Sequence, residues 1–176
     1  MFNEEKFITS DKDLQKLFTS CKNCSKITIA GTTILSYNEL PTLKLPSKDL
    51  HPKICIIINT NTSTTDVGHW FLLALNQPIR QAFIYDSLDS LNEKNPLALQ
   101  AAKNFCKRNN FMYTIIHCQT QKKTSLNCGY VIAYFVHMYH NNSLNHFKKL
   151  CLMFNQIKIE KSERYIMNKV TQFFNT

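Results

Sequence analysis

Cys128 stands where a polar loop meets an apolar helix, a position in which a thiol can act as a nucleophile. Residues 120–140 read TQKKTSLNCGYVIAYFVHMYH, with turn-prone residues before Cys128 and mostly apolar residues after it. The first turn of a helix presents unsatisfied N–H groups and the positive end of the helix dipole, which favour thiolate over thiol. Gly129 lets another backbone approach closely, as an extended substrate requires. An isolated cysteine at such a position is more often a small core residue. Whether Cys128 is a nucleophile therefore depends on whether catalytic partners lie near it.

A cysteine hydrolase also needs a base to accept the thiol proton and an acid to orient that base. His69 is the best base, because it opens the apolar run HWFLLALN directly after a polar loop. Asp86 ends the next run, RQAFIYD. If the two runs form an antiparallel hairpin, the start of one lies beside the end of the other and brings His69 to Asp86. The rivals are His117, late in a strand, and Asp89, past the strand end.

Gln121 is the candidate for stabilising a tetrahedral intermediate. It lies in the loop seven residues before Cys128. Its side-chain amide could join the Cys128 backbone N–H as a donor to the oxyanion. A loop glutamine taken alone is usually only solvated, and Gln119 is a rival for the same role.

Four strand-like runs predict the small sheet that must position these residues. The first, KICIIINT, is unbroken and β-branched, as in a central strand buried on both faces. The next two flank a turn at Asn76-Gln77-Pro78, which indicates an antiparallel meander. The expected strands cover residues 53–60, 69–76, 80–86 and 111–118.

Helical spacing of apolar residues predicts helices around this sheet. The cap candidates are Ser10 or Asp11 for the first helix, and Asn95, followed by Pro96, for the second. The expected helices cover residues 11–21, 95–109, 127–140, 143–154 and 160–174. The sequence therefore predicts an α+β fold with a small, mostly antiparallel sheet and packed helices.

The length and composition suit one globular domain. The chain has 176 residues, of which 44% are hydrophobic and 19% charged. It shows no secretory signal pattern and no apolar run near the ~18 residues of a membrane span, so we expect a soluble, intracellular protein. The net charge of +9 comes mainly from lysine. It suits sequence-independent attraction to DNA, although a merely solvated lysine-rich surface explains it equally well.

The seven cysteines are scattered along the chain, which predicts free thiols in a reducing compartment rather than paired disulfides. Cys21 and Cys24 have half of a zinc-site spacing, but no second pair follows. His137 and His140 lie inside the apolar helix and are more typical of partly buried helix residues than of ligands. No metal site is expected.

Two stretches, residues 53–90 and 120–138, resemble the adenain family of viral maturation proteases and, more distantly, the ubiquitin-like-protein proteases that process SUMO. The shared pattern is an apolar strand, a polar loop, Gly-(Val)-His-Trp, here Gly68-His69-Trp70, two strands ending in an acid, and then Gln, six residues and Cys-Gly. The 17-residue step from His69 to Asp86 and the seven-residue step before Cys128 look like the adenain spacing. The SUMO-protease branch usually has its glutamine one residue closer.

The resemblance implies an adenain-like cysteine proteinase fold over residues 1–176, a single domain, and a thiol endopeptidase that needs no cofactor for its chemistry. It implies that Cys128 is the nucleophile, His69 the general base, Asp86 the orienting acid and Gln121 the oxyanion donor. It also implies that Trp70, Gly68 and Gly129 line the substrate channel. For Trp70 the alternative is a strand residue that faces the core.

The resemblance further implies a monomer that cleaves viral capsid or core precursors at glycine-containing sites, in the virion and the nucleus or cytoplasm of the infected cell, and that is not secreted. DNA is an expected activator. The basic clusters that could bind it are Lys122-Lys123, Lys148-Lys149, and Lys158 with Lys161 and Arg164. A viral peptide activator is the family's other partner.

Two features differ from adenain. The acid is Asp86 instead of a glutamate, and neither Cys106 nor Cys118 falls at the position of the cysteine that binds the activating peptide. The alternatives are a protease that removes SUMO or another ubiquitin-like modifier, and a non-enzymatic basic DNA-binding core protein in which Cys128 is structural.

Overall fold

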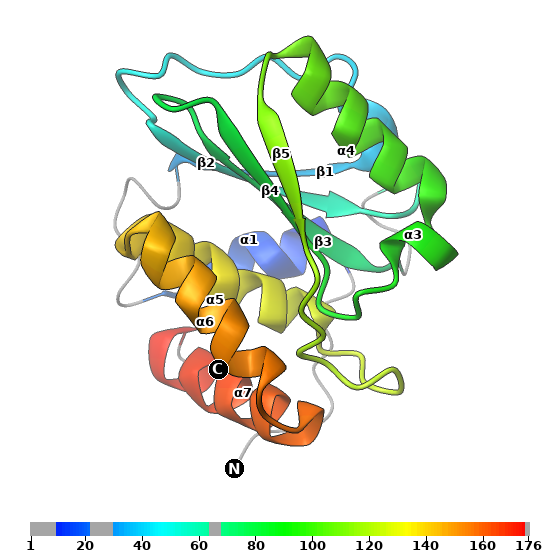
Figure 1. The fold of residues 1–176 in the computed structure, drawn as a ribbon, viewed down its shortest axis with the longest axis vertical. Coiled ribbons are helices and arrows are strands. Elements are labelled where there is room, and N and C mark those ends of the chain that lie inside the picture. The colour runs from blue at the N-terminus through cyan, green and yellow to red at the C-terminus, as the bar shows by residue number, and fades with distance from the viewer. Residues whose placement is uncertain (1–9, 22–29, 64–67, 175–176) are drawn as a thin grey trace.

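A computed structural model describes residues 10–21, 30–63 and 68–174 and shows a sheet between layers of helices (Figure 1). In chain order the elements are α1 (Asp11–Thr19), β1 (Thr32–Ser36), the 3-10 helix η1 (Tyr37–Glu39), β2 (Lys53–Asn59), β3 (Trp70–Asn76), β4 (Gln81–Tyr85), α3 (Leu91–Lys94), α4 (Pro96–Arg108), β5 (Met112–Ile116), α5 (Cys128–Asn141), α6 (Leu144–Asn155) and α7 (Ile159–Phe174). Every strand and helix predicted from the sequence is present, with ends that differ by a few residues.

The five-stranded sheet has the order β1-β2-β3-β4-β5. The predicted antiparallel meander is formed by β2, β3 and β4. Both edge strands, however, pair in parallel, β1 with β2 and β5 with β4. The α+β class is thus confirmed, while the sheet is mixed rather than mostly antiparallel. The parallel pair β4–β5 follows from its connection, because α3 and α4 carry the chain back along the sheet before β5 begins.

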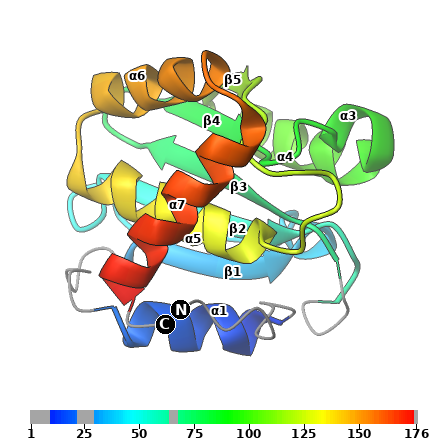
Figure 2. The ribbon, with the colours of Figure 1, turned by 90° about the horizontal axis from the view of Figure 1, so that it is seen from below.

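The sheet has a hydrophobic core on each face. Helix α4 covers one face, and α5, backed by α1, α6 and α7, covers the other (Figures 1 and 2). Successive side chains of β3 alternate between them, with Phe71, Leu73 and Leu75 on the α4 side and Trp70, Leu72 and Ala74 on the α5 side. Since both sides are apolar, the central strands show no hydrophobic alternation in the sequence.

Helix α5 lies between the sheet and α7 and is buried at every residue from Cys128 to His137, as its apolar sequence predicts. Lys53 of β2 caps the carboxyl end of α5. The Lys53 ammonium donates to the carbonyls of Tyr139 at 3.0 Å and Asn142 at 2.6 Å. A cation at this end satisfies free carbonyls and complements the helix dipole. The amino end of α5, which begins at Cys128, is left for other partners.

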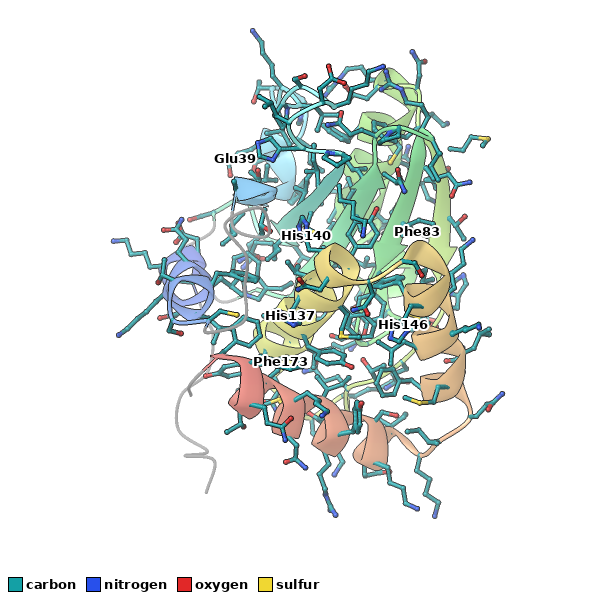
Figure 3. All side chains as sticks on the ribbon, turned by 90° about the vertical axis from the view of Figure 1, so that its left-hand side faces the viewer. Glu39, Phe83, His137, His140, His146 and Phe173 are labelled. Carbon is teal, nitrogen blue, oxygen red and sulfur yellow. The ribbon has the colours of Figure 1, made fainter. Side chains whose placement is uncertain are left out.

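The two histidines inside α5 are packing residues, as predicted. The ring of His137 stacks on Phe173 of α7, with ring centroids 4.3 Å apart (Figure 3). Burial lowers the pKa of His137, and burial together with the charge of Lys53 lowers the pKa of His140 to about 4. Both rings are therefore neutral at pH 7. Within the described ranges, no three His, Cys, Asp or Glu side chains gather as metal ligands.

The sequence pattern did not indicate β1 or α3. Only the last two of the five residues of β1 are buried, so it lacks an apolar run, and α3 is a single turn. The two predicted cap residues, Ser10 and Asn95, lie at the N-caps of α1 and α4 but differ in their bonds. Ser10 accepts a hydrogen bond from the Asp13 N–H and caps α1, whereas Asn95 makes no side-chain capping bond at α4.

The expectation of free thiols is wrong for Cys21, which is disulfide-bonded. Cys24, the other half of the CxxC pair, lies outside the described residues. Within the described ranges, five cysteines are free, namely Cys55, Cys106, Cys118, Cys128 and Cys151. Among the helices that the structure describes, none combines the length and apolar character needed to cross a bilayer.

Candidate active site

Asp86 directly follows β4 and is held by three backbone N–H groups. Its carboxylate accepts from Leu88 at 3.0 Å, from Ser90 at 2.7 Å and from Leu91 at 3.0 Å. Burial opposes the ionised form, but the hydrogen bond and charge of His69, aided by the N–H groups of Leu88 and Ser90, outweigh burial and lower the pKa of Asp86. The acid is therefore ionised and fixed in direction.

His69 lies beside Asp86 because of the hairpin register. Leu72 of β3 pairs with Tyr85 of β4, so the residue before β3 and the residue after β4 are neighbours. Nε2 of His69 hydrogen-bonds Oδ1 of Asp86, which leaves Nδ1 for a second partner. The backbone of His69 is held too, since its N–H donates to Thr60 Oγ1 at 3.1 Å and its carbonyl accepts from the Thr60 N–H at 2.9 Å.

Cys128, the first residue of α5, lies close enough to the His69 side chain to affect its pKa. Burial disfavours the imidazolium, but the hydrogen bonds to Asp86 and Cys128 and their negative charges outweigh burial and raise the pKa of His69 to about 9. The imidazolium is thus the main form of His69 at pH 7. The structure brings together the three side chains that the sequence singled out; their catalytic roles remain predictions.

Gln121 is buried, and its amide is oriented from both sides. The Ser125 carbonyl can only accept, so the nitrogen Nε2 faces it, at 2.7 Å. The oxygen Oε1 then accepts from the Ser87 hydroxyl at 2.7 Å. Nε2 carries a second N–H, which can bind an oxyanion. The rival Gln119 instead donates to the Gln121 backbone carbonyl at 3.0 Å, which favours Gln121 as the oxyanion donor.

Trp70, Gly68 and Gly129 lie next to these residues in the chain. Trp70 is fully buried in the core on the α5 side, which fits the alternative of a core-facing strand residue; a substrate contact stays a prediction. A Cβ on Gly68 would lie 2.1 Å from Oδ1 of the buried Asn59, so a larger residue here would force Asn59 or the chain to shift. Gly129 is buried in the first turn of α5.

The rival residues His117 and Asp89 bind each other instead. Nδ1 of His117 lies 3.0 Å from Oδ1 of Asp89, and the two side chains are 74% and 33% exposed. The lysine clusters named as candidate DNA contacts are exposed as well.

Sequence reasoning missed Ser87, which orients Gln121, and Glu163 of α7, which binds the loop before Cys128. One signal for Glu163 was available. The helical spacing of Ile166, Val170 and Phe174 extends back to position 163, so a carboxylate occupies the apolar stripe of α7. A charge at such a position requires buried partners.

In this site a thiol at a helix amino terminus lies beside an imidazole, and a buried carboxylate orients that imidazole. This arrangement is that of a cysteine peptidase. The sequence matches the Ulp1 protease family, C-terminal catalytic domain, over residues 2–171, and the chain belongs to this family. It is a cysteine peptidase that acts on protein substrates, and its chemistry uses its own side chains without a cofactor. The resemblance to the ubiquitin-like-protein proteases is thereby confirmed, and a non-enzymatic core protein is ruled out.

Solved structures of the SUMO protease Ulp1 with an oxidised catalytic cysteine are similar to this chain. The sulfenic acid form has a TM-score of 0.46 at 16% identity and covers 90% of this chain and 73% of its own. The sulfinic acid form has a TM-score of 0.42 at 15% identity, with 87% and 69% covered, and the sulfonic acid form 0.40 at 14%, with 90% and 78% covered. No curated protein sequence is significantly similar to the chain.

Proposed function

We propose that the chain hydrolyses the peptide or isopeptide bond that follows the C-terminal glycine of a ubiquitin-like modifier. Membership of the Ulp1 protease family supports this substrate class. The observation that carries the proposal is the enclosure of the reacting groups: Cys128 is 8% exposed and the His69 side chain 14%. A scissile carbonyl reaches such a sulfur only through a narrow opening. Glycine, which lacks a side chain, fits that opening best.

The geometry supports acyl transfer. The Cys128 thiolate attacks the carbonyl carbon, and the oxyanion that forms accepts hydrogen bonds from the Cys128 N–H and Gln121 Nε2. The His69 imidazolium donates its proton to the leaving amine, and a thioester on Cys128 results. Neutral His69 then takes a proton from water, which attacks the thioester and releases the carboxylic acid product and the thiolate. Asp86 keeps the imidazole oriented throughout.

The test is hydrolysis of SUMO, NEDD8 and ubiquitin that carry a fluorogenic amide at the C-terminal glycine, with Cys128→Ala as the control. Release of the fluorophore from one modifier, lost in the variant, supports the proposal. If the intact enzyme cleaves short glycine-containing peptides but none of the modifiers, the modifier proposal is wrong.

A second candidate is an endopeptidase that matures viral capsid or core precursors as a monomer in the virion and infected cell. The seven-residue step from Gln121 to Cys128 and the 17-residue step from His69 to Asp86 favour it. The exposed lysine clusters would bind DNA as an activator. For this candidate, peptide cleavage should rise when double-stranded DNA is added, and the rise should disappear at high salt. Rates that are the same with and without DNA count against DNA activation.

A further inference from the structure

Glu163 of α7 binds both ends of the loop that connects Gln121 to Cys128. Its Oε2 accepts from the Lys122 N–H at 3.3 Å, next to Gln121 in the chain. Its Oε1 accepts from the Ser125 hydroxyl and from Asn127 Nδ2, the latter at 3.1 Å. One carboxylate thus holds three groups of the six-residue segment 122–127, and Glu163 itself is only 7% exposed.

The packing of α7 against α5 holds the Glu163 carboxylate in place. Glu163 continues the buried stripe of α7 that includes Ile166 and Val170, and this stripe faces the catalytic helix α5, over which α7 crosses (Figure 2). A buried charge is costly unless donors satisfy it, and here the loop supplies all three. The position of the loop is therefore tied to the position of α7 on α5.

The first consequence concerns the Gln121 side chain. Ser125 donates its hydroxyl to Glu163 while its backbone carbonyl accepts from Gln121 Nε2 at 2.7 Å. The carboxylate of α7 thereby fixes the carbonyl that orients the glutamine amide. Without Glu163, Ser125 loses the anchor that holds this carbonyl in place.

The second consequence concerns the amino end of α5. Asn127 occupies the N-cap position, where an asparagine oxygen commonly accepts from an N–H of the first turn. Here the Asn127 side chain makes no capping bond, and its amide donates to Glu163 instead. Glu163 therefore anchors the residue that directly precedes Cys128, and with it the backbone that carries the Cys128 N–H.

We propose that Glu163 is a positioning residue for the oxyanion site. It orients Gln121 through Ser125, and through Asn127 it fixes the backbone that carries the Cys128 N–H, so that both oxyanion donors are held in place. The proposal rests on the roles proposed above for Cys128 and Gln121, and Glu163 itself touches no substrate.

The test compares Glu163→Ala with Glu160→Ala, which removes an exposed carboxylate one turn away on the same helix. Glu163→Ala should lower kcat by about ten- to a hundredfold and leave KM within about twofold, because oxyanion donors act in the transition state. Alkylation of Cys128 by iodoacetamide forms no oxyanion, so its rate should stay within about twofold of the wild type. Glu160→Ala should change none of these. Glu163→Gln, which keeps Oε1 as an acceptor, should recover part of kcat.

A double-mutant cycle adds a sharper measure. Gln121→Ala should cost far less in the Glu163→Ala background than in the wild type, since both changes disable the same donor. Additive losses, a wild-type kcat in Glu163→Ala, or an equal loss of hydrolysis and alkylation would each overturn the proposal.

Amide hydrogen exchange separates this proposal from the proposed function. If the wild type hydrolyses no modifier and no peptide, the proposed function fails, and the exchange of residues 122–127 then decides the role of Glu163. Faster exchange in Glu163→Ala than in Glu160→Ala supports anchoring of the loop. Identical exchange in the two variants overturns it.

Discussion

The described part of the chain contains two histidine–aspartate pairs whose acids, Asp86 and Asp89, lie three residues apart, and the two pairs differ in exposure and in their further partners. His69 and Asp86 are 14% and 5% exposed, whereas His117 and Asp89 are 74% and 33% exposed. Asp86 accepts three backbone N–H groups in addition to its histidine, and His69 has the Cys128 thiol as a further partner. The comparison shows that the pair itself is common, and that enclosure and added partners make it suited to catalysis.

The physical reason is screening. In water, a solvent-exposed ion pair gains little, typically ~0–1 kcal/mol, because solvent and salt weaken the attraction. In the enclosed pair the same charges act at low local dielectric, and the pKa of His69 rises to about 9 despite the burial that opposes it. The following substitutions test this difference, from the largest expected effect to the smallest.

Removing the two histidines should give the widest separation. His69→Ala should lower kcat by at least about 10³-fold, because both the proton transfer and the charge beside the thiolate are lost. His117→Ala should leave kcat within about twofold. The measurement is steady-state hydrolysis of a fluorogenic glycine substrate by both variants. Comparable losses in the two would mean that the exposed pair also serves catalysis.

Removing the two acids should follow the same order with a smaller effect. Asp86→Asn should lower kcat by about 10²-fold, less than His69→Ala, because Asp86 orients the imidazole and transfers no proton. Asp89→Asn should have little effect. Circular dichroism melting curves of both variants control for unfolding.

The pH profile should separate the acids further. The raised pKa of His69 favours its charged form, so activity that depends on the imidazolium is present at neutral pH and lost as pH rises through about 9. Asp86→Asn removes the negative charge that helps to raise this pKa, and the alkaline fall should move to lower pH. The same linkage makes the stability contribution of His69 complete below its ordinary pKa of about 6.5 and absent above pH 9. An alkaline limb that stays in place in Asp86→Asn would contradict this account.

Gly68→Ala should disturb the enclosed pair indirectly. The new methyl group would meet Asn59 Oδ1 at 2.1 Å, so Asn59 or the chain that leads into His69 must shift. We expect a kcat about tenfold lower and a loss of stability of ~1–2 kcal/mol. Denaturant unfolding and hydrolysis rates measure both effects. Gly129→Ala is the comparison, since it tests the glycine beside the thiol.

The smallest effect should come from the exposed pair itself. Asp89→Asn should change the free energy of unfolding at pH 7 by no more than about 0.5 kcal/mol, because the ion pair that it removes is screened by solvent and asparagine tolerates the left-handed backbone at this position. Urea unfolding at low and high salt provides the measurement. A loss well above 1 kcal/mol would show that the pair supports the fold.

Local sequence determined the chemistry of this protein and the elements that carry it. Apolar runs placed β2, β3 and β4 in order, and the residues at their ends, together with the cysteine that starts an apolar helix, predicted His69, Asp86 and Cys128 as one site. This worked because a hairpin is a short-range feature whose register brings known positions side by side.

Only the tertiary structure decided the rest, because the interactions concerned join residues far apart in the chain. Local sequence favoured His69 over His117 as the base but could not predict that His69 is enclosed and His117 exposed, since exposure depends on which elements cover a side chain. The parallel pairing of β1 and β5 and the hydrogen bonds of Glu163 to the loop before Cys128 likewise required the packed fold. Burial and long-range contacts determine how strongly charged groups interact, and neither can be predicted from the neighbouring residues in the sequence.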